Sequence, residues 1–232
     1  MAVETFNAST TWTCPAGVTS VQVECWGGGA KGFVATVRKW GGGGGAYSKA
    51  NSISVTPGNN YTVTVGPGTS TSGNDTWFGS TGTCLAKGGS NGNGGASGSG
   101  VGDTKYSGGS GGSSALKGVA GGGGGSSAGT ASNGAAGSAS SGNTGGEGGT
   151  APAGGGNGGN GGYYTTPDPV AGSAPGGGGG GPSAVVDGAN GGAGRVVLTY
   201  TAEEPPTGQP AIKRFGGVPF TRQLGSHCIQ VW

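Results

Sequence analysis

The chain has 232 residues, of which 64 are glycine, and charged residues make up only 9% of it with a net charge of +2. So small a charge leaves no electrostatic footprint for nucleic acid, and no apolar stretch has the length of a membrane-spanning helix. Residues 1–10 lack the basic region and the apolar core of a secretory signal. These features predict synthesis in a cytoplasm, no binding of nucleic acid and no insertion into a membrane.

Residues 1–87 carry the patterns of β-strands. Residues 18–26 alternate between apolar and polar, so that Val21, Val23 and Cys25 share one face of a strand. Helix is nearly excluded, because no apolar pattern repeats every 3.6 residues over a useful length and glycine interrupts every possible helix. The N-terminal part is therefore predicted to be all-β.

Two further strands are predicted over residues 46–55 and 61–65. The apolar residues of the first strand change parity, which predicts a bulge before Ile53. The sequence Pro57-Gly58-Asn59-Asn60 is typical of a hairpin turn that would join the two strands directly.

The cysteines are Cys14, Cys25, Cys84 and Cys228, and their spacing matches no metal site. Cys14 and Cys25 could face each other across neighbouring strands. Synthesis in a cytoplasm favours buried free thiols over a disulfide.

No set of catalytic residues is recognisable. The single histidine, His227, has no catalytic partner near it in the sequence. The loop aspartates are scattered, which is typical of residues that support turns, and they are Asp75, Asp103, Asp168 and Asp187. The sequence therefore predicts no enzyme activity, no metal site and no cofactor.

Residues 88–194 hold most of the glycine. Such a composition is typical of disorder, because glycine loses the most backbone entropy on folding and buries no side chain. Glycine at every third position also allows extended threefold helices to pack backbone to backbone. This period appears at Gly146, Gly149, Gly155, Gly158 and Gly161, and its short stretches favour several short helices joined by turns.

A clear strand at residues 195–200 follows the glycine-rich block and decides between these interpretations. A single β core would then hold both ends of the block. The predicted fold is an all-β protein with a β-sandwich scaffold built from residues 1–87 and 195–201. Residues 88–194 would be a glycine-rich insertion that forms short polyglycine II helices.

Beyond the scaffold, residues 202–210 form an acidic, proline-rich linker, and residues 211–232 form an extended C-terminal tail. The tail is too short to bury its own apolar side chains. It is interpreted as a docking peptide, with a strap packed on the scaffold as the alternative. The docking contacts are predicted to be Lys213, Arg214, Phe215, Phe220, Arg222, Ile229 and Trp232.

Aromatic residues inside or next to the glycine-rich parts are the predicted ligand contacts. Tyr163 and Tyr164 stand between glycine and Thr-Thr-Pro, which predicts a loop apex, and Tyr106 and Trp40 are interpreted in the same way. Rigid aromatic side chains provide contact area for sugars or proteins at low entropic cost. The alternative is that they cap the ends of the glycine helices.

In order along residues 5–201, the chain resembles the glycine-rich domain of bacteriophage tail-fibre, adhesin and other virion proteins. The resemblance is carried by Trp12-Thr13-Cys14-Pro15-Ala16-Gly17 and the strand to Gly29, and by residues 41–47, 52–58, 61–66 and 191–200. It implies a β-sandwich with glycine-rich loops that stack as polyglycine II helices and touch the host surface with variable tips. The chain departs from the pattern at Lys31–Trp40, and no receptor contact is carried over.

The resemblance implies a virion structural protein that is displayed for host attachment, and the docking interpretation of the tail adds that residues 211–232 attach it to other virion proteins. Its partners would be these virion proteins and a host-surface glycan or protein, within an oligomer or larger assembly. A capsid decoration protein without a receptor is the first alternative. An ice-binding protein is the second, because flat polyglycine bundles can serve that use.

Overall fold

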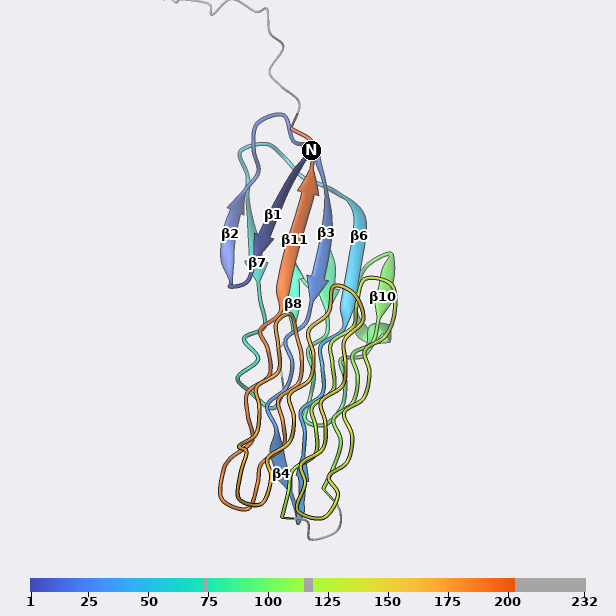
Figure 1. The fold of residues 1–232 in the computed structure, drawn as a ribbon. Coiled ribbons are helices and arrows are strands. Elements are labelled where there is room, and N and C mark those ends of the chain that lie inside the picture. Colours follow the sequence, from blue (N-terminus) through green and yellow to red (C-terminus); the bar gives the residue numbers. More distant parts are fainter. Residues whose placement is uncertain (73–74, 115–118, 203–232) are drawn as a thin grey trace, which may run out of the picture.

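The computed structural model describes residues 1–72, 75–114 and 119–202, which form an elongated molecule with two parts (Figure 1). A β-sandwich makes up one end and a bundle of extended chain segments makes up the other. The N-terminus and the end of the last strand lie at the sandwich end, and strand β4 lies at the opposite end, called the distal end below. The predicted tail at 211–232 and nearly all of the predicted linker lie outside the described residues.

The described strands form two facing antiparallel sheets and one small hairpin. The first sheet has the order β1 (Ala2–Phe6), β11 (Arg195–Tyr200), β3 (Ser20–Trp26), β6 (Tyr47–Ser54) and β10 (Thr104–Tyr106). The second sheet has the order β2 (Thr10–Thr13), β7 (Asn60–Thr64), β8 (Thr76–Phe78) and β9 (Cys84–Ala86). The hairpin consists of β4 (Phe33–Ala35) and β5 (Arg38–Trp40).

The core lies between the two sheets and confirms the predicted alternation. Val21, Val23 and Cys25 of β3 point into it and are buried, and they pack in one cluster with Phe78 of β8 and Leu198 of β11. Each large apolar side chain buried in this way contributes about 1.5–3 kcal/mol relative to exposure. The predicted all-β fold with a sandwich scaffold is therefore confirmed, and β11 closes the sheet between β1 and β3.

The turn at residues 57–60 does not make the predicted hairpin. It connects β6 of the first sheet to β7 of the second, so that the two strands never pair. Gly58 adopts φ +81°, a left-handed conformation that favours glycine, and the turn itself is therefore as tight as predicted. The predicted bulge before Ile53 is confirmed, because the register of β3 against β6 shifts between Val21 and Val23.

The cysteines of the sandwich are free thiols, as predicted. Cys14, Cys25 and Cys84 are all buried and unpaired, and Cys228 lies outside the described residues. Burial raises the pKa of Cys25, and the neighbouring Cys84 thiol raises it further. These thiols act as small apolar core residues.

The second part of the molecule, here called the polyglycine bundle, repeats its contacts every three residues. In segment 41–46, every third amide donates to the same neighbouring segment, with N···O distances of 2.7–2.9 Å. The first and fourth amides bond to segment 109–112, the second and fifth to 176–179, and the third and sixth to 87–91. This is the geometry of a threefold polyglycine II helix. Segment 121–129 repeats it, because the amides of Gly121, Gly124 and Ser127 all bond to segment 156–162, and this confirms the predicted conformation of the glycine-rich insertion.

The centre of the bundle contains almost no side chains. Residues 121–129 are all buried, although they are only glycine, serine and alanine. Their amides and carbonyls bond to six surrounding segments, which are 39–45, 109–112, 135–138, 146–149, 156–162 and 178–181. Because each such hydrogen bond contributes only about 0.5–1.5 kcal/mol net, the bundle depends on forming nearly all of them together.

The number of glycines in a segment depends on how many other segments surround it in the bundle. A Cβ at Gly44, in the unbroken glycine stretch 41–45, would lie 2.0 Å from the carbonyl oxygen of Ser126. Segment 156–162 lies at the surface of the bundle, and there Asn157 and Asn160 face solvent at every third position. The Asn160 side chain also accepts a hydrogen bond of 2.8 Å from the Gly148 amide, which ties two surface segments together.

The boundary between scaffold and insertion differs from the predicted division at residues 87 and 194. Segments 27–32 and 41–46, which the sequence assigned to the scaffold, are part of the polyglycine bundle. Conversely, β10 comes from the insertion and pairs with β6 at the edge of the first sheet. Strands β3, β6 and β11 each continue directly into a bundle segment, as Figure 1 shows.

Stability at high pH should depend on Tyr200. Its hydroxyl donates to the Glu4 carboxylate, which also accepts a bond of 2.9 Å from Trp12 Nε1. Burial, and next the bond to Glu4, raises the pKa of Tyr200 from its ordinary value of 10.0 to about 12. Because the folded value is the higher one, this contribution is complete below about pH 10 and is lost as the pH rises towards 12.

Thermal denaturation in buffers spanning this range measures the effect. The variant Tyr200→Phe is expected to be less stable at neutral pH and to lose less further stability between pH 10 and 12 than the native chain. An equal further loss in both proteins would show that Tyr200 is not the group that titrates.

Candidate functional site

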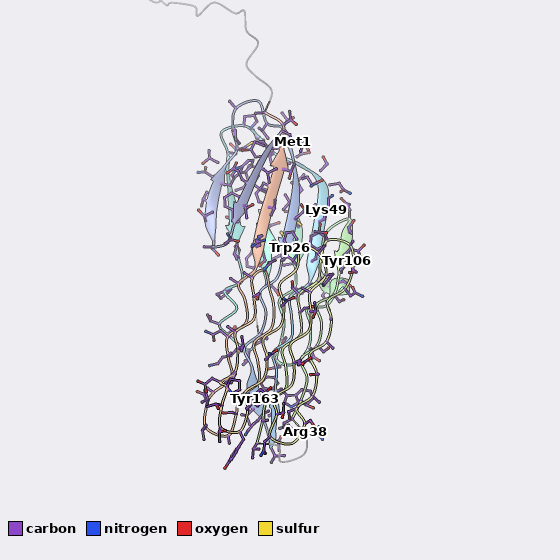
Figure 2. The ribbon with its side chains drawn as sticks, in the orientation of Figure 1. Met1, Trp26, Arg38, Lys49, Tyr106 and Tyr163 are labelled. Atoms are coloured by element: carbon purple, nitrogen blue, oxygen red, sulfur yellow. The ribbon has the colours of Figure 1, made fainter. Side chains whose placement is uncertain are left out.

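The distal end of the bundle brings together most of the aromatic residues that were predicted to contact a ligand. Figure 2 shows Tyr163 and Arg38 near this end, Met1 at the opposite end and Tyr106 between them. Trp40 is in the same hairpin as Arg38. Three of the four predicted contact residues, Trp40, Tyr163 and Tyr164, therefore lie towards the distal end, and Tyr106 does not.

Tyr106 lies at the junction of sandwich and bundle. It belongs to β10 and stacks on Tyr47, with ring centroids 6.3 Å apart and planes 20° from parallel. The same cluster contains Trp26 and Ala128, the last residue from the central segment of the bundle. The expectation of a loop apex is wrong for Tyr106, because its strand pairs with β6 and its ring packs against the scaffold.

Tyr163 and Tyr164 occupy a turn, as their sequence predicted. The Tyr163 amide donates to the carbonyl of Pro167 at 3.0 Å, which closes the turn. The Tyr164 amide donates to the carbonyl of Asn143 at 3.2 Å, so that a second turn supports it. Tyr163 is half-buried and Tyr164 is exposed, which leaves the second ring free to meet a partner.

The β4–β5 hairpin is fixed to the bundle through Lys39. Its amide donates to Ser114 Oγ at 3.0 Å and its Nζ donates to the carbonyl of Val119 at 2.9 Å. Burial lowers the pKa of Lys39. Thr36 adopts φ +56° at the turn of the hairpin. The excursion in the sequence is thus an ordered element, and Trp40 lies in its second strand rather than at a loop apex.

A groove of about 440 Å³ runs along the base of this hairpin. Phe33 and Trp40, which face each other across the hairpin, form its aromatic part. Asn91, Asn93 and Ser110 come from two neighbouring bundle segments and supply its polar part. The hollow is thus an aromatic surface bordered by amide and hydroxyl groups.

The exposed apolar side chains of the described residues fall into two groups. Met1 and Val3 lie at the sandwich end. The others belong to the hairpin and the turns at or near the distal end, and they are Val34, Val37, Tyr164, Val170, Val185 and Val186. Exposed apolar surface that is concentrated at one end marks a contact surface more often than an even scatter does.

Two of the loop aspartates form hydrogen bonds or ion pairs that support the fold. Asp75 forms an ion pair with Lys87 and accepts a bond of 2.9 Å from the Gly88 amide. Asp103 accepts a bond of 2.7 Å from the Asn51 amide. Within residues 1–72, 75–114 and 119–202, no three ligating side chains cluster to hold a metal, and no helix is long and apolar enough to cross a membrane. His227 and all seven predicted docking residues lie outside these ranges.

One family model matches the part of the chain that forms the sandwich and the bundle. A family model described as a glycine-rich domain matches residues 4–201, from β1 to the residue after β11. The chain belongs to this glycine-rich domain family. The match includes both the sandwich and the polyglycine bundle and leaves the C-terminal tail outside it. A comparison with curated proteins found no match.

In this glycine-rich domain, sequence reasoning missed most of the groove. Phe33 lies in the stretch Lys31–Trp40, which was noted as a departure from the family pattern, but it was not among the predicted ligand contacts. Asn91, Asn93 and Ser110 come from stretches that look like ordinary polar spacers between glycines. Only the threefold geometry of the bundle places them beside the hairpin, and no signal in the sequence gives the lateral order of the segments.

Proposed function

We propose that this glycine-rich domain protein is a structural protein of a bacteriophage virion that presents its distal end for attachment to the host surface. Residues 211–232 dock it to other virion proteins, and a host glycan or protein is its partner at the distal end. One observation carries the proposal: the chain enters and leaves the described fold at the sandwich end, while most of the exposed apolar side chains, with Tyr164 among them, lie at or near the other. The resemblance to tail-fibre and adhesin domains supports it.

The position of the chain on the particle tests this proposal. Purified virions would be labelled with an antibody fragment against the native distal end and imaged by electron microscopy. We expect label at the tail tip or fibres. Label spread over the shell would favour a capsid decoration protein instead, and particles without label would contradict a virion role.

A deletion of residues 205–232 tests the docking role of the tail. The truncated chain keeps the whole matched domain, so that it should fold with an unchanged melting temperature but be missing from assembled particles. Mass spectrometry of purified virions measures its incorporation. Normal incorporation of the truncated chain would show that the tail does not dock.

The two tyrosines of the distal turn should matter for attachment and not for stability. Particles with Tyr163→Ala and Tyr164→Ala are expected to adsorb to host cells about tenfold more slowly or worse, because tyrosine is enriched among interface hot spots, whose truncation costs about 2 kcal/mol or more. The matched control is Val3→Ala, which removes an exposed apolar side chain at the sandwich end. Equal adsorption of both mutant particles would favour the alternative that the tyrosines only cap the bundle.

A further inference from the structure

The groove beneath the β4–β5 hairpin is built on fixed backbone. The Asn91 carbonyl accepts a bond of 2.7 Å from Gly43, and the Gly92 carbonyl accepts one of 2.8 Å from Gly111. Ser90 and Asn93 exchange two backbone bonds of 3.0 and 2.9 Å. A site on such a framework loses little conformational entropy when a ligand binds.

The aromatic part of the groove is pressed directly onto the glycine backbone. A Cβ at Gly92 would lie 3.2 Å from Cε3 of Trp40, so that the indole packs against the bare backbone at this position. Trp40 is half-buried and Phe33 lies opposite it in the hairpin. The indole is thus held in place and still presents part of its surface to the groove.

The polar part of the groove offers free hydrogen-bonding groups. Asn91 and Asn93 are exposed, and neither side chain has a hydrogen-bond partner among the described residues. Each amide can donate two hydrogen bonds and accept two. Asn91 is held at φ +51°, an uncommon conformation outside glycine that asparagine tolerates best. None of the eight residues that line the groove is ionisable.

We propose that this groove binds a neutral saccharide, which deepens the proposed attachment function and rests on it. A sugar ring has an apolar C–H face that packs on an aromatic ring and hydroxyl groups that pair with amides, and the groove supplies both. Its volume of about 440 Å³ lies within the usual range of small-molecule sites. An aliphatic ligand without polar groups would leave the amides unpaired, which is unfavourable on burial, and an acidic sugar would find no cation among the eight lining residues.

Binding of defined oligosaccharides to the purified full-length chain tests the proposal. The probes are neutral di- and trisaccharides of hexoses and N-acetylhexosamines on an array, together with sialylated and glucuronate-containing counterparts. We expect binding of at least one neutral probe and weaker binding of its acidic counterpart. Isothermal titration then measures the affinity for the best neutral probe.

Variants locate the binding in the groove. Asn93→Ala should weaken it about tenfold, the effect of one or two lost hydrogen bonds, and Trp40→Ala should weaken it at least as much. Asn190→Ala is the matched control, an exposed amide on the same bundle outside the groove. Melting curves test whether each variant is folded. If Trp40→Ala does not fold, the affinity of Asn93→Ala alone decides whether the saccharide binds in the groove.

Each outcome has a separate meaning. Absence of binding to every neutral probe, or equal affinity of Asn93→Ala and native chain, would overturn the saccharide site. If the chain lies at the tail tip and binds a host protein but no saccharide, attachment stands and this inference fails. If a saccharide binds in the groove but the chain is absent from virions, the groove stands and the virion function fails.

Discussion

Replacement of Gly42 by alanine is expected to destabilise the whole molecule by at least about 4 kcal/mol, in the range reserved for severe core mutations. The Cβ would lie 1.9 Å from the carbonyl oxygen of Ala30 and 2.6 Å from its carbonyl carbon. Both are backbone atoms, so that no rotamer change can relieve the clash. Segments 27–32 and 41–46 would have to separate, and the hydrogen bonds of Gly42 and its neighbours would be lost with them.

Thermal denaturation measures the effect, which corresponds to a fall in melting temperature of about 8–16 °C for a domain of this size. Gly98→Ala is the matched control, because nothing lies within 4 Å of a Cβ at that position. It should change stability by less than about 0.5 kcal/mol. If Gly42→Ala had the same melting temperature as Gly98→Ala, the inference that backbone packs closely against backbone at Gly42 would be wrong.

The spacing of glycine in the sequence predicts the type of helix and also the position of each segment in the bundle. A period of three predicts polyglycine II helices, because such helices turn once every three residues. Stretches with a polar residue at every third position, such as the one with Asn157 and Asn160, belong to the surface of the bundle. Unbroken glycine, as in 41–45 and 121–125, belongs to its centre, where all three faces of the helix meet another segment of the same chain. The glycine spacing of a segment therefore also indicates whether that segment lies at the surface or in the centre of the bundle.

The order of the segments around each centre could not be predicted. Glycine carries no side chain that could select one neighbour over another, so that the turns and the scaffold determine which segments meet. For the same reason the groove at Trp40 was predicted only in part. The aromatic residue was recognised by its chemistry, whereas Asn91 and Asn93 become lining residues only through the lateral packing of their segment.

The strands of the sandwich were easier to predict, because their side chains alternate. The error at residues 57–60 arose because a tight turn with Gly58 is equally compatible with a hairpin and with a crossing between sheets. The sequence shows where the chain reverses. It does not show in which sheet the next strand pairs, since β6 and β7 both bury one face in the same core.

Replacement of Phe78 by alanine is expected to cost about 3–5 kcal/mol, as large-to-small changes in a core do. Phe78 is completely buried between the sheets, stacked on Tyr61 at 5.6 Å and edge-on to Trp12 at 5.9 Å between ring centroids. The cavity would be bordered by these rigid rings, which cannot collapse into it. Val3→Ala, at an exposed position on the edge strand β1, is the control and should have little effect.

The same variant should also weaken the bundle, although Phe78 does not belong to it. Strands β3, β6 and β11 run without a turn into bundle segments. In the described part of the chain, both apolar clusters lie in the sandwich or at its junction with the bundle, so that no separate apolar core holds the bundle segments together. Near-ultraviolet circular dichroism follows the aromatic core of the sandwich, and hydrogen exchange with mass spectrometry follows the amides of 121–129. Both should shift to one lower midpoint in Phe78→Ala. If the amides of 121–129 stayed protected after the sandwich had melted, the bundle would be an independently stable unit, and the hydrogen bonds between its glycines would suffice without a scaffold.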